Sequence, residues 1–218
     1  MSEISDPIFA RIARRYDLMN RVLSLGREQA WRRSGIARLP EGRVLDLGSG
    51  TGAADAVLGE RQVVALDPVI EMLDLSPIHH RVVGVGEELP FADATFDGVF
   101  SAYVFRNLSS LRATLTEVHR VLRPGGRLVV VDLGRPPAPL AAKLHRGLSS
   151  VVLPLAGAAI GARDEYRYLH RSLDKYPAPS ELFSGHDLAL AETWRMGPLG
   201  FVYGAVLTKS SDAPGSLG

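Results

Sequence analysis

The stretch "VLDLGSGTG" (Val44–Gly52) joins a short apolar run to a turn with glycines at positions 48, 50 and 52. An apolar run of this kind predicts a buried strand, and glycine permits both a left-handed turn and a close approach of backbone to ligand. The G-x-G-x-G spacing differs from the G-x-G-x-x-G of dinucleotide-binding turns. Asp46, two residues before the first glycine, would repel a pyrophosphate and suits a cationic ligand.

Similar apolar runs recur along the chain, with helical or turn segments between them. Continuous valine and leucine runs are typical of a parallel sheet that helices cover on both faces. We therefore expect an α/β fold with a Rossmann-like, doubly wound sheet that is mostly parallel and has an antiparallel C-terminal strand. The expected strands after 43–47 are 62–67, 81–86, 96–105 and 127–133, followed by an antiparallel pair at about 189–196 and 201–209.

Three amphipathic segments predict helices between and before these strands. They run from Asp6–Pro7 to near Gly26, over Glu28–Leu39, and over Leu111–Leu122, where Ser109 or Ser110 caps the start and "RPGG" (123–126) ends the helix. We expect an N-terminal helical lid (1–40), one globular domain (41–209) and a disordered tail (210–218).

Composition excludes several classes of protein. A net charge of +1 is too small for a general nucleic-acid binder, and the absence of cysteine excludes thiolate metal sites. The six histidines form no pair at metal-ligand spacing, so we expect no metal. The chain opens without an apolar signal core, which predicts a cytoplasmic protein.

Two features could bring the protein to a membrane surface. Residues 1–43 carry nine arginines against five acids, which indicates either an anionic membrane contact or a solvated helix face. The longest apolar run, "VVLPLAGAAIGA" (Val151–Ala162), predicts a buried helix and turn, or alternatively a wall or lid for an apolar substrate.

A carboxylate ends the second predicted strand, and there Asp67 could accept both hydroxyls of a ribose. The glycine turn followed by this acid resembles the S-adenosylmethionine site of class I methyltransferases. The resemblance implies that the turn lies against the methionine part of the cofactor and that Met72 packs against its adenine. The residues expected to bind the cofactor are Asp46, Gly48, Ser49, Gly50, Thr51, Gly52, Asp67, Pro68, Met72, Gly86 and Glu87.

Four longer blocks resemble the UbiE/MenG family, whose members methylate a ring carbon of a quinol in ubiquinone and menaquinone biosynthesis. The resemblance implies methylation of a prenylated, lipid-soluble quinol, with demethylmenaquinol favoured. It also fits a homodimer and peripheral contact with the inner membrane face through the N-terminal helix and residues 140–162. The blocks are "FARIARRYDLMNRVLSLGREQAWRR" (9–33), "EELPFADATFDGVFSAYVFRNL" (87–108), "LTEVHRVLRPGGRLVVVDLGRP" (115–136) and "YRYLHRSLDKYP" (166–177).

The chain departs from this family pattern at four places, one of which is the segment between Asp67 and Arg81, shorter than usual by about a helical turn or more. Ala53 and Val85 stand where the family usually has acids, and "GFVYGAVL" (200–207) lacks the usual histidine. Two other hypotheses therefore stay open: a methyltransferase for another phenolic or lipid acceptor, O-methylation included, and a non-catalytic protein that binds S-adenosylmethionine.

Arg106 and Asn107 follow a predicted strand at the edge where open parallel sheets bind ligands. A ring carbon attacks a sulfonium only when the ring is electron-rich, and a phenol has a pKa of about 10. An arginine nearby lowers such a pKa, so we expect Arg106 to stabilise the quinolate and Asn107 to fix the ring hydroxyl or the loop. Tyr16, Asp17 and Asn20 would close the pocket from the lid, with Asp17 as a candidate base.

Overall fold

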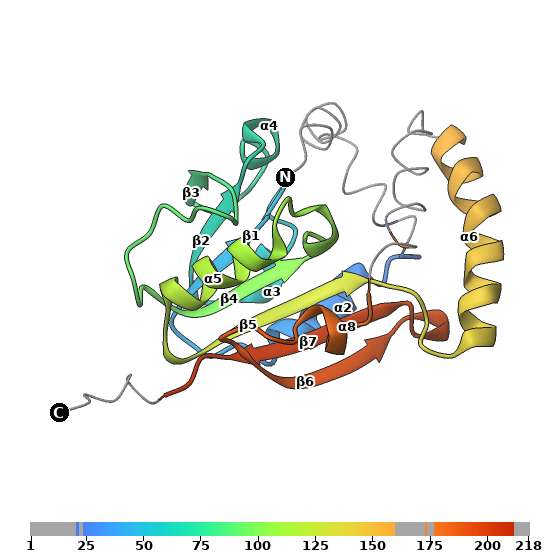
Figure 1. The fold of residues 1–218 in the computed structure, drawn as a ribbon. Helices are drawn as coiled ribbons and strands as arrows, with labels where there is room; N and C mark the ends of the chain where they lie inside the picture. Colours follow the sequence, from blue (N-terminus) through green and yellow to red (C-terminus); the bar gives the residue numbers. More distant parts are fainter. Residues whose placement is uncertain (1–20, 22–23, 160–172, 174–176, 212–218) are drawn as a thin grey trace.

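The computed structural model describes residues 21, 24–159, 173 and 177–211 (Figure 1). Its centre is a seven-stranded sheet in the order β3-β2-β1-β4-β5-β7-β6. The first five strands along the chain are parallel, and β7 runs antiparallel to both of its neighbours. The strands are β1 (Arg43–Leu47), β2 (Gln62–Asp67), β3 (His80–Val83), β4 (Phe96–Ala102), β5 (Leu122–Leu133), β6 (Ala189–Met196) and β7 (Val202–Thr208).

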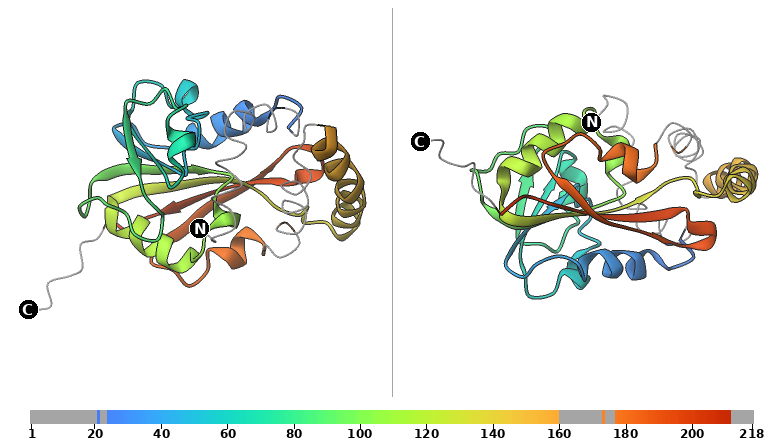
Figure 2. Two further views of the ribbon diagram at one scale, coloured as in Figure 1. Left: turned by 90° about the horizontal axis from the view of Figure 1, so that it is seen from above. Right: turned by 60° about the horizontal axis from the view of Figure 1, so that its bottom comes forward.

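Helices cover the sheet on both faces, as Figure 2 shows edge-on. On one face, α2 packs Trp31 and Ile36 against valines of β5 and β7. On the other face, α5 and α8 bury Leu115, Val118 and Leu182 against alternate residues of the same strands. The helices are α2 (Glu28–Ile36), α3 (Asp55–Leu58), α4 (Ile70–Leu73), α5 (Leu111–Val121), α6 (Pro139–Ala159) and α8 (Pro179–Leu182), with short 3₁₀ turns η1 (Phe105–Asn107) and η2 (Pro198–Gly200).

The expected doubly wound sheet with an antiparallel C-terminal strand is confirmed. The expected cap of α5 is also confirmed, because the Ser110 hydroxyl accepts a hydrogen bond from the backbone N–H of Ala113 at 3.2 Å. The predicted N-terminal lid lies outside the described residues, apart from α2 and the few positions before it, and so does most of the predicted tail.

Several boundaries differ from the expected ones, among them the end of α2 at Ile36 rather than at Leu39. "RPGG" lies inside β5, because β5 begins at Leu122 and shifts register against β4 between Phe96 and Gly98. β4 ends at Ala102 rather than at 105, because Tyr103 takes a left-handed φ of 66° that no strand contains. β3 ends at Val83, before a second short segment in which Val85 bridges to Glu88.

Helix α6 corrects the prediction of a buried helix at Val151–Ala162. It stands beyond the end of β5, apart from the sheet (Figures 1 and 2), and its Val151, Val152 and Leu155 are each more than half exposed. His145, which stacks on Phe201, lies on the side of the helix nearer the sheet. None of the helices in the described ranges is both long enough and apolar enough to cross a bilayer.

Candidate functional site

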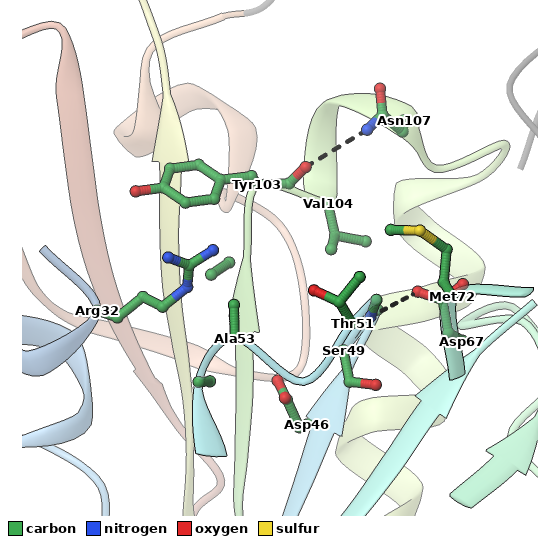
Figure 3. Close-up of a pocket in the computed structure, with 14 residues that line it drawn as sticks. Arg32, Asp46, Ser49, Thr51, Ala53, Asp67, Met72, Tyr103, Val104 and Asn107 are labelled. Carbon is green, nitrogen blue, oxygen red and sulfur yellow. Dashed lines mark hydrogen bonds between the residues drawn. The ribbon is translucent and has the colours of Figure 1, made fainter. Parts of the chain in front are cut away.

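A pocket opens at the carboxyl ends of β1, β2 and β4, the edge at which open parallel sheets bind ligands. It encloses about 650 Å³ of atom-free space, part of which is open to solvent. Its walls come from segments far apart in the sequence. They are formed by Arg32, Asp46, Gly48, Ser49, Gly50, Thr51, Ala53, Ala54, Asp67, Met72, Ala102, Tyr103, Val104 and Asn107 (Figure 3).

The glycine turn forms the floor of this pocket because its backbone is left-handed and tightly packed. Gly48 has a φ of +71°, and a Cβ added there would collide with the side chain of Val104. Gly50 has a φ of +55°, and its Cβ would come within 3.2 Å of the methyl group of Met72. Conformation thus favours glycine at both positions, and lack of space adds to this requirement at Gly48.

Asp67 fastens this turn to the end of β2. Its Oδ2 accepts a hydrogen bond from the backbone N–H of Gly50 at 2.9 Å, and its Oδ1 accepts one from Val69 at 2.9 Å. A carboxylate has about four acceptor sites, so these bonds leave capacity for a ligand hydroxyl. Asp67 therefore shapes the pocket besides lining it.

Asp46 is the buried acid of the pocket. Asp46 is only 2% exposed, and its Oδ2 has no hydrogen-bond partner. The pKa of Asp46 is raised to about 7: burial is the main cause, the charge of Arg32 opposes the rise, and the charges of Asp67 and Asp55 add to it. A cationic group placed against this buried carboxylate would stabilise its ionised form.

Arg32 is a pocket residue that the sequence analysis did not single out. It is buried on α2, and its guanidinium lies 5.1 Å from the centre of the Tyr103 ring. In Figure 3 it faces the hollow from the side opposite Asp67 and Met72. It is the basic side chain among the pocket residues, which makes it the group able to bind a carboxylate.

The segment after β4 forms the upper wall around the strained residue Tyr103. Its backbone N–H donates to Val131 at 2.8 Å, which holds it on the sheet. Its carbonyl oxygen accepts two hydrogen bonds, from Arg106 Nη1 at 3.1 Å and from Asn107 Nδ2 at 3.4 Å. A non-glycine residue in a left-handed conformation is often found at functional sites.

The structure brings together most, but not all, of the predicted site residues. Arg106 lies beside the pocket rather than in its lining: its Nη1 is 3.7 Å from Asp132, a buried acid at the end of β5 that the sequence analysis also missed. Glu87 accepts hydrogen bonds from the backbone of Ser109 and Ser110 at the start of α5. Asn107 lines the pocket, and so do all of the predicted cofactor residues except Gly52, Pro68, Gly86 and Glu87. The predicted lid residues, which lie outside the described part of the chain, are Tyr16, Asp17 and Asn20.

The residues present fit S-adenosylmethionine. The pocket carries two acids and one base, which complements a ligand with a sulfonium, an ammonium and a carboxylate. The unpartnered Asp46 Oδ2 offers an acceptor to the cationic end, and Arg32 a donor to the carboxylate. The close glycine backbone leaves room where a side chain would intrude.

Comparison with known proteins gives the family. A sequence model of the ubiE/COQ5 methyltransferase family matches residues 2–186. A demethylmenaquinone methyltransferase of Beutenbergia cavernae is 42% identical over 180 residues (78% of this chain and 75% of the relative). One of Thermus thermophilus is 38% identical over 192 residues (80% and 87%), and the ubiquinone/menaquinone biosynthesis C-methyltransferase UbiE of Syntrophotalea carbinolica is 38% identical over 190 residues (80% and 80%).

Solved structures support the fold. An S-adenosylmethionine-dependent methyltransferase of Thermotoga maritima has a TM-score of 0.62 at 16% identity, covering 93% of this chain and 99% of that one. Another from Methanococcus maripaludis has a TM-score of 0.61 at 16% identity, covering 98% and 99%. With the strand order, the charged pocket and a match over most of its length, the chain belongs to the ubiE/COQ5 methyltransferase family and is an S-adenosylmethionine-dependent methyltransferase.

Proposed function

We propose that the protein methylates a ring carbon of a prenylated quinol, with demethylmenaquinol as the acceptor. The observation that carries this proposal is one pocket that joins the cofactor-binding acids Asp46 and Asp67 to Asn107, the last residue of the "FRN" block. The relatives named as demethylmenaquinone methyltransferases support the choice of ring. When bound, S-adenosylmethionine supplies a methyl group on a positively charged sulfur.

Cofactor binding is assigned to the charged lining. Asp46 faces the cationic end, Arg32 pairs with the carboxylate, and Asp67 accepts hydrogen bonds from the ribose. Met72 packs on the adenine, supported by its place in the pocket lining. These residues position the donor and exclude water, which is the main contribution that an enzyme makes to an in-line displacement.

The acceptor is assigned to the Tyr103–Asn107 side of the pocket. Arg106 stays protonated and therefore acts by charge: it lowers the pKa of the phenolic hydroxyl next to the target carbon. Asn107 lines the pocket and orients the ring hydroxyl, and Tyr16, Asp17 and Asn20 stay predicted contributors from the lid. The shared Tyr103 carbonyl links Arg106 to Asn107, which supports a joint role.

The test is turnover by purified protein with labelled S-adenosylmethionine and short-chain reduced quinones. Demethylmenaquinol should gain one methyl group on carbon, and a simple phenol should gain none. Product methylated on oxygen, or turnover restricted to another phenol, would replace this proposal by the second hypothesis. In cells without the protein, the quinone pool should be lighter by one CH₂ unit.

We also propose that α6 places the enzyme on an anionic membrane, where a lipid-soluble quinol resides. Its outer side carries a stripe of five residues that are between 53% and 81% exposed: Leu140, Leu144, Leu148, Val151 and Leu155. Lys143 lies beside this stripe, and the helix, which also carries Arg146, contains no acid. An apolar stripe on a basic helix is the pattern of interfacial helices, whereas two copies facing each other would bring like charges together.

Vesicle flotation tests this contact. The protein should bind vesicles rich in anionic lipid better than neutral ones, and Leu148→Glu should reduce binding at least about tenfold. Ser150→Glu is the matched control, because it adds the same charge to an exposed position of α6 beside the stripe. If both variants lose vesicle binding equally, the added charge and not the apolar stripe is the cause, which contradicts the proposal. A dimer that is seen by light scattering and is lost in Leu148→Glu would show that the stripe binds a second copy of the chain.

A further inference from the structure

Asp132 is a charged residue in a place where charge is disfavoured. It lies at the carboxyl end of β5, is 0% exposed and stands opposite Tyr203 of β7. Its Oδ1 accepts a hydrogen bond from the backbone N–H of Leu133 at 2.7 Å, and its Oδ2 has no hydrogen-bond partner. An apolar residue would fill this strand position at lower cost, so the carboxylate calls for an explanation.

Arg106 supplies the compensating charge. Burial raises the pKa of Asp132, and the charge of Arg106 is the largest influence that opposes this rise. The Arg106 side chain is itself only 10% exposed, and it cannot become neutral by losing its proton. Among the described residues, Asp132 is the acid that pairs with it. Each group therefore makes the burial of the other tolerable.

The pair is tied to the pocket wall by one backbone atom. Arg106 Nη1 reaches the Tyr103 carbonyl as well as Asp132, and Asn107 donates to the same carbonyl. Tyr103 is in turn hydrogen-bonded to the neighbouring strand through its N–H. A displacement of the Arg106 guanidinium would thus be transmitted to Asn107 within the pocket.

We propose that Asp132 is a positioning residue for methyl transfer, because its buried carboxylate holds the Arg106 guanidinium at the Tyr103 carbonyl and so fixes Arg106 and Asn107 beside the acceptor. This inference rests on the proposed function of Arg106. Asp132 does not line the pocket, so we expect it to act on the substrate only through Arg106 and Asn107. Its substitution should therefore lower kcat while the cofactor affinity stays the same.

A double-mutant cycle tests this role with quinol turnover and S-adenosylhomocysteine affinity as the two readouts. Asp132→Asn should lower kcat by about 100-fold, the loss expected for a misplacement of about 1 Å, with Kd within about twofold of the original. In the Arg106→Ala background the same change should alter kcat by less than about threefold. An equal fall of kcat in both backgrounds would show a general structural role and overturn the inference.

Two further variants keep the test decisive. If Asp132→Asn does not fold, Asp132→Glu replaces it in the same cycle, since it keeps the charge and moves it by one methylene group. Asp97→Asn is the matched control: Asp97 pairs with Arg123 at 2.6 Å at the opposite end of β4, so kcat should not change. Absence of quinol methylation by the unsubstituted protein would reject the proposed function, and normal turnover of Arg106→Ala would reject the role given to Arg106. Normal turnover of Asp132→Asn beside an inactive Arg106→Ala would reject only the inference.

Discussion

Asp46→Asn tests the electrostatic basis of cofactor binding. Burial raises the pKa of Asp46 to about 7, against a usual value of about 3.9. At 1.36 kcal/mol per pKa unit, the difference of about three units means that keeping Asp46 ionised in the folded, ligand-free protein costs ~4 kcal/mol. The folded state binds the proton more tightly than the unfolded chain does.

The sign of the stability effect follows from this difference. An acid whose pKa is raised on folding lowers the free energy of unfolding as pH rises from about 4 to about 7, and the loss is complete above that range. Asp46→Asn cannot ionise, so it should increase the stability of the ligand-free protein at about pH 8 by up to ~4 kcal/mol. The gain will be smaller to the extent that Arg32 loses a counter-charge. Urea unfolding at several pH values measures it.

Ligand binding should show the opposite preference. The ammonium group of S-adenosylhomocysteine favours the ionised form of Asp46, so the affinity for this ligand should fall by up to tenfold per pH unit below about pH 7. Calorimetry in two buffers of different ionisation enthalpy should detect proton release on binding at about pH 6. In Asp46→Asn, both the pH dependence and the proton release should disappear, and the affinity at about pH 8 should be lower.

The result that would refute this reasoning is an affinity in the unsubstituted protein that does not change between about pH 5 and pH 8. The same slope in Asp46→Asn would assign the titration to another group. Asp55→Asn is the control: Asp55 is half-buried and raises the pKa of Asp46 through its charge alone. Its removal should shift the midpoint slightly toward lower pH and leave binding intact.

Three other substitutions test separate parts of the site and fold. Gly48→Ala should abolish cofactor binding and destabilise by more than Gly26→Ala. Both glycines have a positive φ, but only the Cβ added at Gly48 would meet a side chain, and thermal unfolding of both variants measures the difference. Arg32→Gln should weaken S-adenosylhomocysteine binding by about 10- to 100-fold in calorimetry, and Arg33→Gln, on the exposed side of the same helix, should not. Ser110→Ala should lower the free energy of unfolding by about 1 kcal/mol in urea, through loss of the α5 cap, without changing kcat.

The sheet and the glycine turn could be predicted because their signals are local. Continuous valine runs identify buried parallel strands, and Asp46 and Asp67 occur at strand ends that a parallel sheet brings to one edge. The methyltransferase assignment is confirmed by the family match over residues 2–186. The exposed face of α6 was not predicted, because an apolar run alone does not tell a core helix from one that stands apart from the sheet.

Asp132 shows a different limit of sequence reasoning. It ends an apolar strand like Asp46 and Asp67 do, but β5 lies between β4 and β7, and its last residues sit behind η1 rather than at the pocket. The amino-acid sequence alone does not show that the end of β5 lies behind η1 and away from the pocket. Only the contact with Arg106 indicates that the charge belongs to the site.

The place of Arg32 in the pocket could have been predicted from the side of α2 on which it lies. Residues 31, 32, 35 and 36 share the buried side of α2, and Trp31 and Ile36 identify that side from the sequence. Gly35 lets the helix approach β5 so closely that an added Cβ would come within 2.7 Å of Val131. A long basic side chain on such a face cannot reach solvent across the sheet, so it must extend along it to the carboxyl edge, where the pocket acids lie. Arg33, one residue later, has the same chemistry and is exposed. The helical period therefore distinguishes the buried Arg32 from the exposed Arg33, whereas residue type alone does not.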